Sequence, residues 1–125
     1  MINHHNQYAG LILCLDDDVN GLAARTGVLA SAGFEVLAAS DPAEAIEILK
    51  SRKVDLVVSD HFLKGVTGTE LSKSFKEIQP TVPILILSGS VQRLDDLGAA
   101  DDFMHKADGP LALIDIAHRM IAGSR

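Results

Sequence analysis

Five short apolar runs, each followed by a segment with helical periodicity, constrain the fold of this 125-residue chain more than any other feature. Continuous apolar runs suit strands that are buried on both faces, and such strands occur in parallel sheets covered by helices on either side. The strand–helix alternation runs along the whole chain without an internal sequence repeat. It predicts an α/β domain with a doubly wound, five-stranded parallel sheet. The predicted strands cover residues 11–15, 34–39, 55–59, 84–87 and 103–105.

Helix boundary signals fall between these strands. Asp41-Pro42-Ala43-Glu44 has the pattern of a capping box, with proline at the first helical position. Gly33 marks the end of the first helix, and Gly109-Pro110 starts the last one. The segment 91–98 has room for only two turns, so we expect a shortened fourth helix.

The chain is expected to hold one domain. Residues 1–9 show no periodicity and are predicted to form a flexible tail, which leaves the domain over residues 10–122 and a short end at 123–125. With 47% hydrophobic residues, a chain of this length can bury a core. The single cysteine, Cys14, excludes a disulfide framework and is expected to fill the core.

Charge and hydropathy exclude several classes of protein. The net charge is −6, whereas broad binding to a nucleic-acid backbone requires clustered Lys and Arg. The longest apolar stretches, such as 84–87, are far too short to span a membrane. We therefore expect a cytoplasmic protein that contacts neither nucleic acid nor membrane directly.

Polar residues end four of the five predicted strands. In doubly wound sheets the ligand site lies outside the carboxyl ends of the strands, so these residues are the first candidates for function. Each alone has a structural explanation, such as a helix cap or a turn, and it is their joint placement that favours function. They are Asp16, Asp17 and Asp18 after the first strand, Asp60 after the third, Ser88 after the fourth and Lys106 after the fifth.

These residue types indicate phosphoryl chemistry. Carboxylates that lie close together repel one another unless a cation sits among them, and oxygen ligands of this kind suit Mg²⁺. A lysine and a hydroxyl beside the cation can hold the oxygens of a phosphoryl group. The pattern therefore predicts a carboxylate nucleophile that forms an acyl phosphate, with Mg²⁺ beside it.

Four segments in order resemble one family. Residues 13–18, 55–68, 83–89 and 98–106 are similar to the acidic, phosphoacceptor, switch-hydroxyl and lysine motifs of response-regulator receiver domains from bacterial two-component systems. That family includes the single-domain chemotaxis regulator. The resemblance covers nearly the whole chain and implies a flavodoxin-like fold with strand order 2-1-3-4-5.

The resemblance implies that Asp60 accepts a phosphoryl group from a histidine kinase or a histidine phosphotransfer protein. It implies that Asp16, Asp17 and Asp60, together with the backbone carbonyl of Phe62, bind Mg²⁺ as the cofactor. The chain is then a signalling receiver that catalyses only its own phosphorylation and dephosphorylation, and not an enzyme acting on other substrates.

The same resemblance assigns the switch. Lys106 pairs with the phosphoryl oxygens, the Ser88 hydroxyl moves to hydrogen-bond them, and the rotamer of Phe103 follows that movement. A downstream protein, not identified by the sequence, reads the change, and a homodimer is left open.

Three departures from the family pattern stand out. Ala107 follows Lys106 where the family has a proline with a cis bond, and we expect a trans bond or an altered loop because cis bonds without proline are unfavourable. Only 17 residues separate Ser88 from Lys106, so the fourth helix is short and the usual output surface is in doubt. Phe62 is bulky where hydrolytic water would approach, and we predict that it prolongs the life of the acyl phosphate.

Two alternative functions remain open at this point. A degenerate receiver would keep the fold and act as a docking module without phosphorylation. A haloacid-dehalogenase-type phosphatase would instead use the D-x-D opening at the first strand. In that scheme Asp16 is the nucleophile, Asp18 the acid, and Ser88, Lys106 and Asp101 or Asp102 complete the set.

Overall fold

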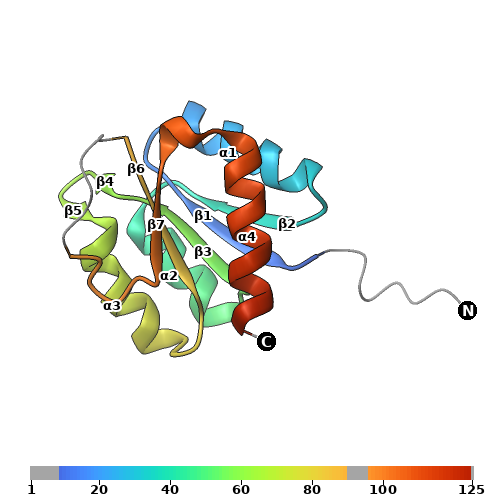
Figure 1. Ribbon diagram of the computed structural model, residues 1–125. Coiled ribbons are helices and arrows are strands. Elements are labelled where there is room, and N and C mark those ends of the chain that lie inside the picture. The colour runs from blue at the N-terminus through green and yellow to red at the C-terminus, as the bar shows by residue number, and fades with distance from the viewer. Residues whose placement is uncertain (1–8, 90–95, 125) are drawn as a thin grey trace, which may run out of the picture.

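The computed structural model describes residues 9–89 and 96–124, which build a five-stranded parallel sheet with helices on both faces (Figure 1). The strand order is β2-β1-β3-β6-β7, which is 2-1-3-4-5 when only the strands of this sheet are counted. The predicted doubly wound architecture is thereby confirmed. The strands are β1 Leu11–Leu15, β2 Glu35–Ala39, β3 Leu56–Asp60, β6 Ile84–Ser88 and β7 Asp102–His105.

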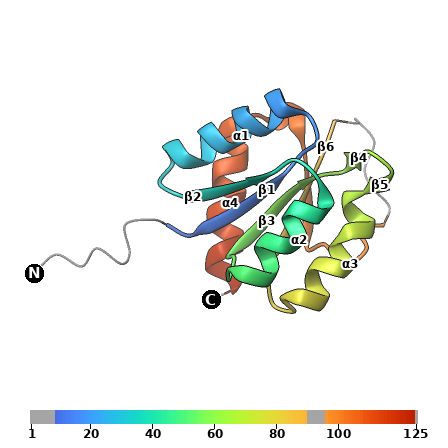
Figure 2. The same cartoon turned by 180° about the vertical axis from the view of Figure 1, so that it is seen from behind.

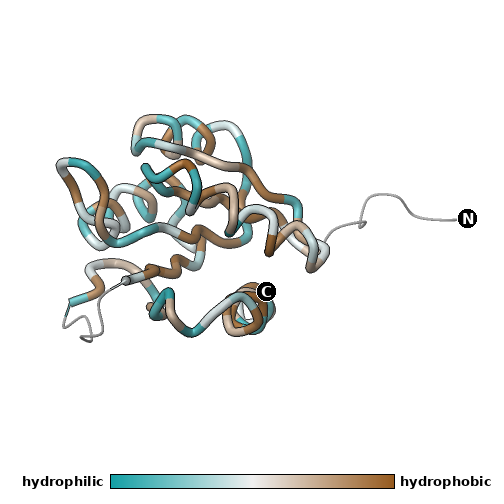
Figure 3. The backbone as a smooth tube through the Cα atoms, turned by 90° about the horizontal axis from the view of Figure 1, so that it is seen from above, coloured by the Kyte–Doolittle hydropathy of each residue, from teal (hydrophilic) through white to brown (hydrophobic). Residues whose placement is uncertain are grey.

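Burial explains why the central strands have uninterrupted apolar sequences. Every residue of β1, β3 and β6 is buried, because helices cover both faces of the sheet there. The edge strands β2 and β7 are only partly buried. Figure 3 shows hydrophobic residues along the strands in the middle of the molecule, between the helices.

Two helices cover each face of the sheet. Helices α1 (Val19–Ser31) and α4 (Pro110–Ser124) pack on one face, and α2 (Pro42–Ser51) and α3 (Gly68–Ile78) pack on the other, as a comparison of Figures 1 and 2 shows. A separate hydrophobic cluster lies under each pair of helices, with Phe34 among the largest buried side chains on the first face and Phe75 on the second.

Side chains cap the helices at the carboxyl edge of the sheet. The predicted cap of α2 is confirmed: Asp41 Oδ1 accepts a hydrogen bond from the Glu44 N–H at 2.8 Å. Glu44 Oε1 in turn accepts a hydrogen bond at 2.8 Å from the N–H of Ser40, the residue before the cap. Thr67 caps α3 through the Glu70 N–H at 3.1 Å. These caps satisfy backbone donors that the first helical turn leaves without partners.

Two short elements near the carboxyl edge were not predicted. Strands β4 (Phe62–Leu63) and β5 (Val66–Thr67) form a small antiparallel hairpin between β3 and α3. A 3-10 turn, η2 (Lys106–Asp108), follows β7. The peptide bond between Lys106 and Ala107 is trans, as expected in the absence of proline.

Some predictions fall beyond the described part of the chain. The tail over residues 1–9 lies outside it except for Ala9, and most of the shortened helix over 91–98 also lies outside it. The described end of that segment, residues 96–98, is not helical. Within the described residues, none of the helices has the length and apolar character that crossing a bilayer requires.

Candidate functional site

Parallel pairing brings the acids at two strand ends together. Leu15 of β1 lies opposite Ser59 of β3, so the residues that follow them, Asp16 and Asp60, emerge side by side at the carboxyl edge. One carboxylate oxygen each from Asp16, Asp17 and Asp60 lies within 4.8 Å of the other two. The predicted cluster of three acids is therefore present at the carboxyl edge of the sheet, where strands β1 and β3 end next to each other.

The acids are held by hydrogen bonds from the surrounding backbone. Asp16 is 1% exposed and its Oδ1 accepts from the Asp18 N–H at 2.9 Å. Asp17 is half-buried, and its Oδ2 accepts from the Lys64 N–H in the hairpin at 3.0 Å. A buried carboxylate without such partners would be strongly unfavourable. The bond to Lys64 also fixes the β4–β5 hairpin, which contains Phe62, against the acids.

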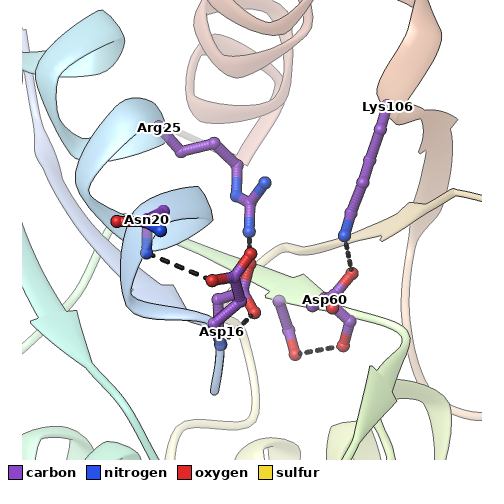
Figure 4. Close-up of polar contacts among 7 residues, drawn as sticks. Asp16, Asn20, Arg25, Asp60 and Lys106 are labelled. Atoms are coloured by element: carbon purple, nitrogen blue, oxygen red, sulfur yellow. Dashed lines mark hydrogen bonds and ion pairs between the residues drawn. The ribbon is translucent and has the colours of Figure 1, made fainter.

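Lys106 forms an ion pair with Asp60. Asp60 is the last residue of β3 and is 6% exposed, and Lys106 follows the end of β7. The Lys106 Nζ lies 2.8 Å from Asp60 Oδ1 (Figure 4). The ends of β3 and β7 thus place a cation directly against the Asp60 carboxylate, whereas the predicted pairing of Lys106 with phosphoryl oxygens stays a prediction.

The predicted switch residues lie on the adjacent strands. Ser88 ends β6 and is fully buried, one position past Leu87, which is the register partner of Asp60. Phe103 of β7 is half-buried; it packs against the hydrophobic cluster under α2 and α3, and its ring centroid lies 5.4 Å from that of His105. Both positions are compatible with the assigned roles, which stay predictions.

Gly68 gives the backbone of Asp60 its position. The Gly68 N–H donates to the His61 carbonyl at 2.7 Å, and the Ser59 hydroxyl donates to the Asp60 carbonyl at 3.0 Å. A Cβ atom at Gly68 would lie only 2.5 Å from that same Asp60 carbonyl oxygen. The first turn of α3 therefore approaches Asp60 as closely as a residue without a side chain allows.

The phosphatase alternative fails on the position of its remaining acids. Asp101 and Asp102 lie at the amino ends of β6 and β7, opposite the edge that carries Asp16. Asp101 Oδ2 accepts from the Ile84 N–H at 2.8 Å and pairs with Lys76 Nζ at 2.8 Å, so it joins strand to helix. The set of residues that this chemistry requires is not brought together.

Arg25 is a site residue that the sequence did not reveal. It lies within α1, and its guanidinium forms an ion pair with Asp16 Oδ2 (Figure 4). A single arginine inside a helix carries no motif, and the fold alone turns its side chain back toward the strand ends. The three clustered acids are consequently faced by two cations of the chain itself, Arg25 and Lys106.

The residues present fit a magnesium ion. The donors are carboxylate oxygens, which this hard cation prefers, and two of the three acids are buried. The two facing cations offset only two of the three negative charges, so the cluster keeps an excess of negative charge.

Comparison with known proteins identifies the family. The chain matches the response regulator receiver domain over residues 12–117. It is 33% identical over 104 residues to the alkaline phosphatase synthesis transcriptional regulatory protein PhoP of Bacillus subtilis, covering 79% of this chain and 43% of that protein. It is 38% identical over 77 residues to the transcriptional regulatory protein GlrR of Escherichia coli, covering 61% of this chain and 17% of that protein. The chain thus spans less than half the length of either relative.

Solved structures of receiver domains share the fold of this chain. A CheY-like receiver domain protein from Methanospirillum hungatei superposes with a TM-score of 0.84 at 22% identity, covering 92% of this chain and 95% of the other, and so shares the fold. The response regulator TrrA of Thermotoga maritima, solved in complex with Mg²⁺-BeF, gives a TM-score of 0.82 at 25% identity, covering 89% and 98%. The chain belongs to the response regulator receiver domain family, a class of signalling modules in two-component systems.

Proposed function

We propose that this chain is a phosphoacceptor receiver in which Asp60 takes a phosphoryl group from the phosphohistidine of a histidine kinase or a histidine phosphotransfer protein. The observation that carries this proposal is the environment of Asp60. It is a buried carboxylate at a strand end, paired with Lys106 at 2.8 Å and clustered with Asp16 and Asp17 within 4.8 Å. The degenerate-receiver alternative is disfavoured because a docking module has no use for this complete set.

The transfer exchanges one bond for another. An Asp60 carboxylate oxygen attacks phosphorus, the N–P bond of the phosphohistidine breaks, and the imidazole of the donor leaves with its electron pair and takes up a proton. Lys106 Nζ, already on Asp60 Oδ1, then lies where the phosphoryl oxygens gather charge. Preorganised charges of this kind stabilise the transition state because they need not reorient during the reaction.

Magnesium would be held by Asp16, Asp17 and Asp60 and by the backbone carbonyl of Phe62. When bound, it supplies positive charge beside the phosphoryl oxygens, which allows an anionic donor to approach an anionic acceptor. The complex of the related TrrA with Mg²⁺-BeF supports this assignment by similarity. The hydrogen bond from the Lys64 N–H to Asp17 keeps the Phe62 segment next to the acids.

Phosphorylation would be read through the buried Ser88 and the half-buried Phe103. The modification adds about −1.5 to −2 charges at Asp60, and a hydroxyl that moves toward the new oxygens leaves space for an aromatic ring on the next strand. Ser88 and Phe103 lie on the paired strands β6 and β7, which couples the two movements. The resulting surface change would be recognised by a downstream protein or by a second copy of the chain.

Incubation with phosphoramidate and Mg²⁺, followed by intact-protein mass spectrometry, tests the proposal. We expect the parent to gain one phosphoryl group and Asp60→Asn to gain none. Asp102→Asn, which removes an exposed carboxylate at the opposite edge of the sheet, should behave as the parent does. Borohydride reduction of the acyl phosphate and peptide mapping then locate the modified residue.

The alternatives give different results in the same experiment. Phosphate on Asp16 instead of Asp60 would revive the phosphatase scheme. An amide NMR spectrum that stays unchanged with Mg²⁺ and beryllofluoride, a mimic of the acyl phosphate, would favour the docking module.

A further inference from the structure

We propose that the Arg25 guanidinium competes with Mg²⁺ for Asp16. It thereby sets the Mg²⁺ concentration at which the receiver becomes competent for phosphorylation. This inference rests on the proposed function, because it concerns the same cluster of acids. It assigns a regulatory task to a residue outside the acceptor set of Asp60, Lys106 and Ser88.

The contact itself occupies Asp16. The Arg25 side chain is 15% exposed and Asp16 is 1% exposed, so the two charges meet out of contact with bulk solvent. The guanidinium pairs with Oδ2, while Oδ1 accepts the Asp18 N–H at 2.9 Å. Both oxygens of Asp16 therefore have partners from the chain, and a metal ion that uses this carboxylate must share or displace one of them.

The packing around the pair leaves little space for both cations. A Cβ atom at Gly21 would lie 2.9 Å from Asp16 Oδ2 and 3.3 Å from Arg25 Nη2, so the pair is pressed against the first turns of α1. Mg²⁺ requires a nearly octahedral shell of oxygen ligands at short distances. A guanidinium on Oδ2 hinders that shell directly.

The charge of Arg25 is a second reason to expect that it weakens Mg²⁺ binding. With Arg25 and Lys106 in place, three carboxylates keep one uncompensated negative charge; without Arg25 they keep two. Interactions between buried charges are screened less by salt than those between exposed charges.

The cavity beside Arg25 is an unfavourable place for a displaced guanidinium. Arg25 also lines a cavity of about 200 Å³ between α1 and α4, whose walls are mainly apolar and include Val28 and Leu113. The other charged residue at this cavity is Lys106, which carries the same sign. Moving Arg25 from Asp16 into this space is unfavourable, and the opposing free energy weakens Mg²⁺ binding.

Calorimetric titration with Mg²⁺ tests the inference on the full chain. We expect the Mg²⁺ dissociation constant of Arg25→Gln to be about tenfold lower than that of the parent. Arg119→Gln is the matched control, since it removes the same charge from an exposed i,i+4 pair with Asp115, and it should leave the constant unchanged. An unchanged or raised constant in Arg25→Gln would overturn the inference.

A second measurement needs no variant and so does not depend on the folding of Arg25→Gln. The Nε–Hε resonance of Arg25 in the parent should shift on saturation with Mg²⁺ because the guanidinium leaves Asp16. A resonance that does not move would count against the competition.

The outcomes separate this inference from the proposed function. Tighter Mg²⁺ binding by Arg25→Gln together with no phosphate on Asp60 would retain the competition and reject the acceptor role. Phosphate on Asp60 of the parent, together with equal Mg²⁺ affinities of parent and Arg25→Gln, would retain the acceptor role and reject the competition.

Discussion

At the scale of single residues, the close approach of Gly68 to Asp60 has a measurable consequence. A methyl group at Gly68 would meet the Asp60 carbonyl oxygen at 2.5 Å, so Gly68→Ala must displace either α3 or β3. We expect it to lower the free energy of unfolding by about 1–3 kcal/mol. Urea denaturation followed by circular dichroism measures the change.

Gly27 supplies the matched control for that substitution. It lies in α1, and a Cβ atom added there would have no neighbour within 4 Å. Gly27→Ala should therefore raise the free energy of unfolding by roughly 0.5–1 kcal/mol through helix propensity. Equal effects of the two substitutions would show that Gly68 has no special packing role.

Cys14 illustrates how burial controls reactivity next to the site. Desolvation by burial raises the pKa of its thiol from 9.0 to about 12, against a smaller lowering by Arg25. At pH 8 only about one folded molecule in ten thousand then carries the reactive thiolate. Alkylation by iodoacetamide should therefore be very slow in the folded protein and fast in urea, and rapid labelling of the folded chain would contradict this account.

The pH dependence of stability follows from the same shift. Because the pKa is higher in the folded than in the unfolded state, stability from Cys14 is complete below pH 9 and is lost as the pH rises toward 12. Cys14→Ala should show a shallower loss over that interval.

Phe62 remains the candidate shield for the acyl phosphate. Phe62 is 61% exposed, and its ring contacts the ring of His61, with centroids 4.6 Å apart. We expect Phe62→Asn, once phosphorylated, to lose phosphate several-fold faster than the parent because water reaches the acyl phosphate more easily. Release of inorganic phosphate after removal of the donor measures the rate, and an equal rate would reject the shield.

At the scale of elements, Gln79 at the end of α3 joins two segments of backbone. Its Nε2 donates to the carbonyls of Leu49 at 2.8 Å and Arg52 at 2.6 Å, and its Oε1 accepts from the Val54 N–H at 3.1 Å. Gln79→Ala leaves these three groups without their partner and should lower the free energy of unfolding by about 1–3 kcal/mol. Thermal denaturation measures the loss.

The exposed Glu77, two residues earlier on α3, provides the control, since Glu77→Ala removes a side chain without breaking such a link. If Gln79→Ala were no more harmful than Glu77→Ala, the link between α2, α3 and β3 would be energetically unimportant.

The elements that the sequence predicts well are those with periodicity or a cap. The five strands of the sheet lie within one residue of their predicted bounds, and the cap at Asp41 and the Pro110 start of α4 lie where the pattern placed them. The β4–β5 hairpin was not predicted because strands of two residues cannot show alternation. Val19 has the helical spacing of an inner residue yet is 70% exposed, because it opens α1 beyond the edge of the sheet.

At the scale of the whole molecule, the position of the candidate site was predictable because the fold class determines where strand ends meet. Asp16, Asp17, Asp60 and Lys106 follow from that rule together with the residue types. Arg25 and Gln79 could not be predicted in the same way. Their roles depend on which backbone and side-chain groups the packed helices bring within reach, and no local pattern encodes those distances.

Because Asp60 pairs with Lys106, the site is complete only after the strand that precedes Lys106 has folded. Asp16 and Lys106 lie ninety residues apart in the chain, and among the described strands β7 pairs with β6 alone. A nascent chain therefore lacks the site until its last strand has emerged and docked. The pairing of β1 with β3, which brings Asp16 beside Asp60, joins residues 44 positions apart, and parallel pairings over such separations form slowly because loop closure precedes the contacts that reward it.

Mg²⁺ should therefore change the rate of unfolding and not the rate of folding. We expect an ion that binds Asp16, Asp17 and Asp60 to slow unfolding and to leave the refolding rate unchanged, because the long-range pairing of β1 with β3 that assembles this cluster is expected to form after the transition state for folding. Stopped-flow circular dichroism across a denaturant series, with and without Mg²⁺, should displace the unfolding limb alone. A displaced refolding limb would mean that the acids gather early. In the expected case Mg²⁺ lowers the unfolding rate and so lengthens the lifetime of the folded receiver.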